Sequence, residues 1–231
     1  MLKKRIISLL TYYDSVLYRT KEFEADYRYG DSYIDTKYVD EIVLLDISPT
    51  AKFRVMFERI LMDLAQQSFI PLAVGGGVKS VCDAERLISL GADKIVVNTA
   101  WVYEPTLLSS LARQFGSQAV VAGIDAVATG TGYKRFEWRK KVVSELDILD
   151  QVSLAVRHGA GEILLNSVDR DGSLLGLDID LISKTCSESE IPVICAGGAG
   201  SWEHFSQALS IEGVDGVATS NIYHFTETSM K

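Results

Sequence analysis

Cysteine and histidine are scarce in this chain of 231 residues, with three of each. Cys82, Cys186 and Cys195 fit neither a metal-ligand spacing nor an even-numbered disulfide framework, and the histidines share no metal-ligand spacing. This excludes a zinc-binding or disulfide-stabilised domain. The cysteines are therefore expected to be reduced thiols, and the sequence predicts no metal site and no cofactor.

Positive charge is also in short supply. Lysine and arginine number 23 against 31 aspartate and glutamate residues, which gives a net charge of -8 at pH 7. Because nucleic acids and anionic membranes need a basic face on their partner, this balance argues against both ligands. No apolar run is long enough to cross a bilayer or to form a secretory signal after the basic N-terminus. We expect a cytoplasmic protein without a nucleic-acid or membrane partner.

Short β-branched runs alternate with longer amphipathic stretches, which is typical of a parallel sheet with crossover helices. Eight strands are expected near residues 5–11, 41–46, 71–74, 94–98, 119–124, 162–168, 192–196 and 214–219. Helical patterns cover residues 51–67, 80–90, 104–114, 145–158, 178–187 and 202–212. This count predicts the α/β class and a TIM (β/α)8 barrel, in which residues 1–231 form one domain.

Three segments depart from a regular barrel. Only residues 32–39 are left for a helix before the second strand, so we expect a shortened first helix. The chain stops at Lys231, soon after the eighth strand, so the last helix is expected to be missing or truncated. Residues 129–141 alternate in the manner of a β-hairpin inserted after the fifth strand, and a solvated loop is the alternative.

A possible phosphate cradle occurs twice in the sequence. An apolar run ends in consecutive glycines at residues 75–77 and again at residues 197–198, about 121 positions later. A second apolar run follows each cluster and ends in small polar residues, at Asn98 and at Ser220. Because glycine has no side chain, its backbone N–H groups can close on an anion. The repeat predicts a twofold half-barrel repeat and a substrate with a phosphate at each end.

Six motifs carry a wider resemblance, and they lie at residues 74–78, 91–94, 97–100, 123–126, 167–172 and 197–200. Through them the chain resembles, over almost its whole length, the cyclase subunit of imidazole glycerol phosphate synthase, the HisF family. The resemblance implies a lyase of histidine biosynthesis that takes ammonia from a partner glutaminase. The family uses this ammonia on a doubly phosphorylated ribulosyl substrate, the kind of ligand that the repeated cradle predicts independently.

The resemblance implies two phosphate sites at the mouth of the barrel. The first set is Gly77, Asn98 and Thr99. The second set is Asp171, Gly172, Gly198, Ser220 and Asn221. Uncharged donors are adequate at such sites because several N–H groups oriented together stabilise a phosphate dianion.

A further implied feature lies at the opposite, amino-terminal mouth of the barrel. Four charged residues fall at or near the starts of strands one, two, four and six, namely Arg5, Glu41, Lys94 and Glu162. In the family such a ring gates the entry through which ammonia passes from the glutaminase, a HisH-like subunit. Charges placed there only for solubility are the alternative.

The catalytic pair of the family carries over only in part. The family uses two carboxylates, at the ends of strands one and five, as a general acid and base. Asp125 occupies the second position, but Thr11 stands at the first, and a threonine hydroxyl does not exchange protons near neutral pH. We therefore expect cyclase activity to be severely weakened or absent. Asp46 and Asp169 point toward the mouth, where they bind substrate hydroxyls, position Asp125, or cap loops.

Three functions remain open at this point. The retained ring and the lost carboxylate resemble divergent paralogues found with surface-polysaccharide genes. In those proteins the barrel, with a phosphosugar or doubly phosphorylated ligand, supplies ammonia to a separate sugar amidotransferase that turns an acetamido sugar into an acetamidino sugar. The second function is a genuine cyclase of histidine biosynthesis, in which another group replaces the missing carboxylate. The third is a non-catalytic phosphate-binding scaffold.

Overall fold

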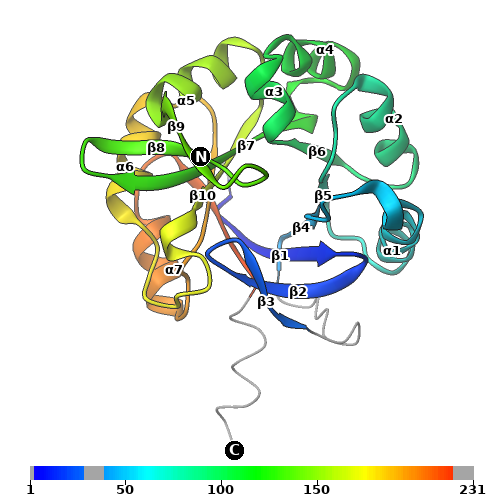
Figure 1. Ribbon diagram of the computed structural model, residues 1–231, viewed down its shortest axis with the longest axis horizontal. Helices are drawn as coiled ribbons and strands as arrows, with labels where there is room; N and C mark the ends of the chain where they lie inside the picture. The colour runs from blue at the N-terminus through cyan, green and yellow to red at the C-terminus, as the bar shows by residue number, and fades with distance from the viewer. Residues whose placement is uncertain (1–2, 29–38, 221–231) are drawn as a thin grey trace, which may run out of the picture.

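Eight parallel strands close into a barrel in the computed structural model, which describes residues 3–28 and 39–220 (Figure 1). The strand order is β10-β11-β12-β1-β4-β5-β6-β7, and pairing between β7 and β10 closes the ring. The strands are β1 (Arg5–Tyr13), β4 (Glu41–Asp46), β5 (Leu72–Gly75), β6 (Lys94–Val97), β7 (Val120–Thr129), β10 (Glu162–Ser167), β11 (Val193–Ala196) and β12 (Val214–Thr219). They confirm the eight expected strands and the TIM barrel.

Helices surround the barrel (Figure 1). In the described ranges they are α1 (Arg54–Gln67), α2 (Val81–Ser89), α3 (Thr99–Tyr103), α4 (Thr106–Phe115), α5 (Ile148–Arg157), α6 (Ile179–Glu188) and α7 (Trp202–Leu209), with 3-10 turns η2 (Ala51–Phe53), η3 (Ser117–Ala119) and η4 (Val168–Arg170). The expected helix 104–114 starts two residues late because Pro105 keeps Glu104 out of the helical region, at ψ 78°. A short helix that was not expected, α3, precedes it.

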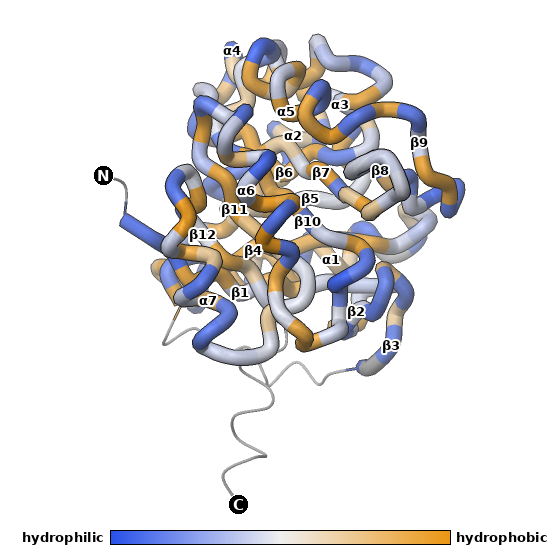
Figure 2. The backbone as a smooth tube through the Cα atoms, turned by 90° about the vertical axis from the view of Figure 1, so that its left-hand side faces the viewer, coloured by the Kyte–Doolittle hydropathy of each residue, from blue (hydrophilic) through white to orange (hydrophobic). Residues whose placement is uncertain are grey.

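The barrel interior is apolar. Alternate strand residues point inward and form one cluster: Ile7, Leu9, Val43, Ala73, Val96, Val121, Leu164, Ile194, Ala196 and Ala218. The intervening residues, such as Ile42 and Leu44, belong to a larger cluster with helix side chains that include Phe57 and Leu61. Figure 2 shows apolar segments running along the strands, as a sheet buried on both faces requires.

A hairpin that the sequence did not predict follows the first strand. Instead of ending at Thr11, β1 continues to Tyr13 and pairs with β2 (Val16–Lys21), which pairs with β3 (Glu24–Arg28). The turn between β1 and β2 places Asp14 and Ser15 at φ 49° and 61°. Tight hairpin turns of this kind usually contain asparagine or glycine, so the sequence carried no strong turn signal.

The expected hairpin after the fifth strand is confirmed and is larger than residues 129–141. The strand β7 extends to Thr129 and pairs with β8 (Gly132–Glu137), which pairs with β9 (Val142–Asp147). We call residues 126–147 the arm. The expected helix start at residue 145 was wrong, because β9 continues to Asp147, whose carboxylate accepts the Leu149 N–H and caps α5.

The internal repeat is visible in the backbone. Gly76 and Gly197 have φ 106° and 93°, and a Cβ atom at either position would overlap the carbonyl oxygen of the preceding strand's end, Asp46 or Ser167. Only glycine fits such a turn without strain. Both members of the second contact lie 121 positions after those of the first, so the two half-barrels share the geometry of this turn.

Some expectations lie outside the described residues. The shortened first helix falls on residues 29–38, and the missing or truncated last helix on residues 221–231. Over residues 3–28 and 39–220, no helix combines the length and apolar character that crossing a membrane requires.

Candidate functional site

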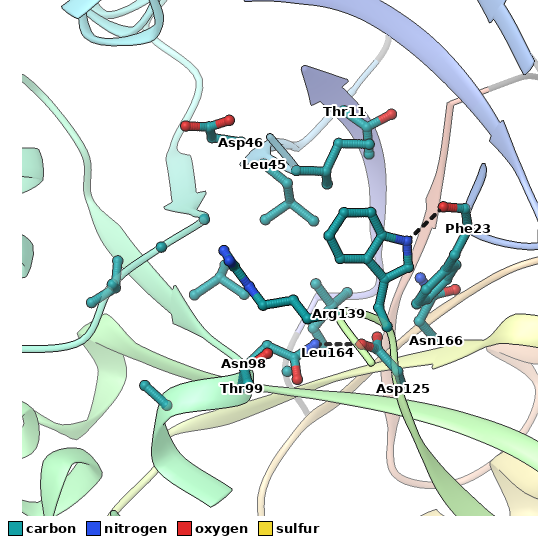
Figure 3. A pocket seen from close by; sticks show the side chains of 18 of the residues that line it. Thr11, Phe23, Leu45, Asp46, Asn98, Thr99, Asp125, Arg139, Leu164 and Asn166 are labelled. Carbon is teal, nitrogen blue, oxygen red and sulfur yellow. Dashed lines mark hydrogen bonds between the residues drawn. The ribbon is translucent and has the colours of Figure 1, made fainter. Parts of the chain in front are cut away.

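A cavity of about 470 Å³ opens at the carboxyl ends of the strands, where TIM barrels carry their active sites (Figure 3). Its floor is the apolar top of the barrel interior, including Leu9, Val96 and Leu164. Polar side chains that line it include Thr11, Asp46, Asn98, Thr99, Asp125, Asn166 and Asp171. The structure thus brings most of the predicted polar residues to one place.

Asp125 lies on the wall of this cavity, where the Asn98 Nδ2 group donates a 2.7 Å hydrogen bond to its Oδ2 atom (Figure 3). Burial raises the pKa of Asp125 to about 6, against the opposing effects of the Asn98 amide and the Arg135 guanidinium. The carboxylate of Asp171 contributes further to the rise. A carboxyl group with a pKa close to neutrality suits general acid or base chemistry.

The raised pKa of Asp125 predicts a pH-dependent cost in stability. The folded state holds the proton more tightly than the unfolded state, so stability falls as the pH rises from about 4 to about 6. We expect Asp125→Asn to be more stable than the wild type at pH 7 by up to about 3 kcal/mol, seen as a higher urea midpoint, and to match it near pH 4. Equal urea midpoints at pH 7 would contradict the expectation.

Thr11 faces the same cavity from β1, and its hydroxyl is committed to the backbone. Its Oγ1 atom donates a 2.6 Å hydrogen bond to the Tyr18 carbonyl on β2, and the residue is buried. Asp14, three residues further on, lies in the turn and does not line the cavity. The position therefore offers no carboxyl group opposite Asp125.

The first predicted phosphate set comes together at one side of the cavity. Gly77, Asn98 and Thr99 all line it. Beside them, Arg54 Nη2 donates a 2.7 Å hydrogen bond to the Gly76 carbonyl, and its Nη1 lies 3.4 Å from Asp46 Oδ2. Asp46 therefore holds Arg54 against the glycine turn, while its other oxygen accepts the Ser48 N–H. The predicted role of Asp46 toward substrate remains a prediction.

The second predicted phosphate set lies at a small adjoining cleft of about 20 Å³. Asp171, Gly172, Gly198 and Ser220 line this cleft, and Asn221 lies outside the described residues. Asp171 also lines the large cavity, so the two spaces meet at this residue. Burial raises its pKa, although the Phe23 N–H and the Thr20 hydroxyl lower it.

Asp169 does not line either space. Its carboxylate accepts a 2.7 Å hydrogen bond from the Ala128 N–H, and so it holds the base of the arm. This contact fits the reading of Asp169 as a residue that fixes a neighbouring loop. A direct role toward substrate remains a prediction.

The four charged residues at the amino-terminal mouth form a closed ring. Arg5 lies 2.6 Å from Glu41 and 2.9 Å from Glu162, and Lys94 lies 3.1 Å and 2.8 Å from the same two residues. Burial lowers the pKa of Arg5, but attraction by the two carboxylates outweighs this effect and raises it. The ring covers the end of the apolar interior opposite the cavity, and its gating role stays a prediction.

Several residues at the cavity were missed from the sequence. Asn166 lies directly across from Asp125 in the pairing of β10 with β7, and its inward alternation with Leu164 could have identified it. Trp138 and Arg139 reach the cavity from the arm. Phe23 reaches it from the β2–β3 turn and accepts a 2.8 Å hydrogen bond from Trp138 Nε1. No local pattern marks these contacts, because they arise only when the hairpins fold over the barrel.

A closed (β/α)8 barrel with its polar residues gathered in one cavity at the carboxyl ends of the strands has the architecture of a TIM-barrel enzyme. The family described as histidine biosynthesis protein matches residues 19–229. The HisF subunit of imidazole glycerol phosphate synthase from Chloroherpeton thalassium is 39% identical, over 100% of this chain and 94% of that protein.

Two other HisF subunits agree with this match. The subunit from Dictyoglomus turgidum is 43% identical over 80% of this chain and 74% of its own length. The subunit from Caulobacter vibrioides is 37% identical over 100% of this chain and 91% of its own length. The chain belongs to the HisF family of imidazole glycerol phosphate synthase subunits.

Proposed function

We propose that this barrel receives ammonia from a HisH-like glutaminase at its amino-terminal mouth and delivers it to the cavity at the opposite end. The closed charged ring and the apolar interior support this route. An ion would lose its hydration in such an interior at a high cost, whereas neutral ammonia would not. Once the ring opens, the apolar interior behind it would admit neutral ammonia and exclude the ammonium ion.

We further propose that the delivered ammonia serves sugar amidination by a separate amidotransferase. The observation that carries this step is Thr11, which lines the cavity but donates its hydroxyl to the Tyr18 carbonyl. Of the two strand-end positions that the family uses for proton transfer, only the one at Asp125 carries a carboxyl group here. The cyclase chemistry of the family needs two such groups, so this chain retains delivery and lacks half of the acid and base pair.

Histidine-type cyclisation is the second candidate, and the placement of Asp171 favours it. This carboxylate lines the same cavity as Asp125 and lies close enough to raise its pKa. Asp171 would then take the place of the missing carboxylate. Under either candidate function, we propose a cytoplasmic protein.

The test combines the purified barrel with a glutaminase homologue. We expect a complex, stimulated glutamine hydrolysis, and only slow conversion of the family's ribulosyl substrate when ammonium salts are supplied. Conversion near normal cyclase rates would remove the amidination proposal in favour of the second candidate. If the glutaminase is not stimulated in any ligand state, the barrel is a phosphate-binding scaffold instead.

A further inference from the structure

Two residues of the arm reach the cavity and have no role in the proposal so far. Trp138 and Arg139 follow directly after β8, and both line the cavity. In Figure 3 the Arg139 side chain extends into the cavity toward the side where Asp46 and Thr99 lie. Its Nη1 atom donates a 3.3 Å hydrogen bond to the Pro49 carbonyl, which places the guanidinium beside the loop that follows β4.

Among the residues that the structure describes, Arg139 has no acidic partner. Across the described ranges, no salt bridge includes Arg139, nor does one include Lys79, the other cation that lines the cavity. By contrast, Arg54 is already occupied by Asp46 and the Gly76 carbonyl. A guanidinium without an acidic partner, in the cavity that Gly76 and Gly77 also line, is suited to bidentate contact with a phosphate.

The two glycine turns, equivalent in backbone, differ in charge. Arg139 and Lys79 add positive charge on the side of the first turn. At the second turn, the charged side chain that lines the cleft is the carboxylate of Asp171, and no cation lines it among the described residues. A dianion is therefore favoured at the first turn.

Trp138 is fixed in place above the cavity. Its Nε1 atom donates to the Phe23 carbonyl at 2.8 Å (Figure 3). The Phe23 N–H in turn donates to Asp171 Oδ2 at 3.0 Å. Phe23 also packs edge-on against Phe136 of the arm, with ring centroids 6.2 Å apart. The arm and the β2–β3 hairpin thus hold a flat aromatic surface against the space beside Arg139.

We infer that Arg139 and Trp138 are ligand-binding residues, in which Arg139 pairs with a phosphate at the first glycine turn and Trp138 covers the sugar to which that phosphate is attached. The ligand class is a sugar phosphate monoester. This inference rests on the proposed function only for the position of the anion. It adds a cation and an aromatic surface, both from the arm, to the uncharged donors of the first phosphate set, Gly77, Asn98 and Thr99.

The test is calorimetric titration of the full chain with inorganic phosphate and with ribose 5-phosphate at low salt. We expect Arg139→Gln to weaken binding of both ligands about tenfold, because a charge-assisted hydrogen bond is lost. Trp138→Leu should weaken only the binding of ribose 5-phosphate. Lys140→Gln is the matched control, since it removes the same charge one residue away, outside the cavity.

An equal loss in Arg139→Gln and Lys140→Gln would overturn the inference, as would failure of the wild type to bind either ligand. Unchanged circular dichroism melting of each variant shows that folding is intact. Stimulation of the glutaminase by the ligand-free barrel is measured separately with Arg139→Gln. If Arg139→Gln binds phosphate as tightly as the wild type and still stimulates the glutaminase, the arm's role is refuted while ammonia delivery is not.

Discussion

Replacing Thr11 with aspartate is expected to raise the ammonia-dependent conversion of the ribulosyl substrate by about 100-fold or more, the usual contribution of one general acid or base. The variant places a carboxyl group on β1 at the rim of the cavity that Asp125 lines from β7. Since the glycine turns and Asn98 already lie at the cavity, we expect the missing proton-exchanging group to be what limits cyclisation. The measurement is turnover of the purified barrel with ammonium salts.

The matched control for this prediction is Thr11→Asn. Asparagine has the shape of aspartate and also replaces the threonine hydroxyl, but it exchanges no proton near neutral pH. We expect Thr11→Asn to remain as slow as the wild type. A gain of equal size in both variants would mean that loss of the threonine hydroxyl, rather than a carboxyl group, restores turnover.

The barrel could be predicted from the sequence because its strands are buried on both faces. Runs such as residues 41–46 and 192–196 are apolar and β-branched, and they are separated by helical stretches. The hairpins are different. The turns at Asp14 and at Glu22 adopt left-handed conformations without glycine, so nothing local announces them. Contacts across the barrel, such as the Asp171 hydrogen bond to Phe23, decide their conformation.

The same distinction applies to the site. Asp125 and Asn98 follow from their places at strand ends, and the resemblance to the family marked the ring of charges. Arg139 comes from a segment that alternates like any exposed hairpin. Its position in the cavity depends on how the arm folds back, which is a tertiary property. Residues on inserted hairpins are therefore the part of this site that a sequence does not locate.

Replacing Glu41 with glutamine is expected to destabilise the fold by about 3–5 kcal/mol, the usual cost of removing one partner from a buried ion pair. Glu41 is only 2% exposed, and its carboxylate holds both Arg5 and Lys94. The neutral amide leaves Glu162 as the one carboxylate of the ring for both cations, which are themselves mostly buried. The measurement is the free energy of unfolding in urea.

Glu24→Gln provides the matched control, because it makes the same chemical change in an ion pair with Lys141 that is largely exposed. We expect it to cost no more than about 1 kcal/mol, as solvent already screens the pair. A similar small cost for Glu41→Gln would show that the ring is held mainly by other contacts of its strands. A large cost for Glu41→Gln together with a small cost for Glu24→Gln would mean that the fold needs the Glu41 charge. The ring could then not open by neutralising this carboxylate. Ammonia would then have to pass by a movement that keeps each cation paired.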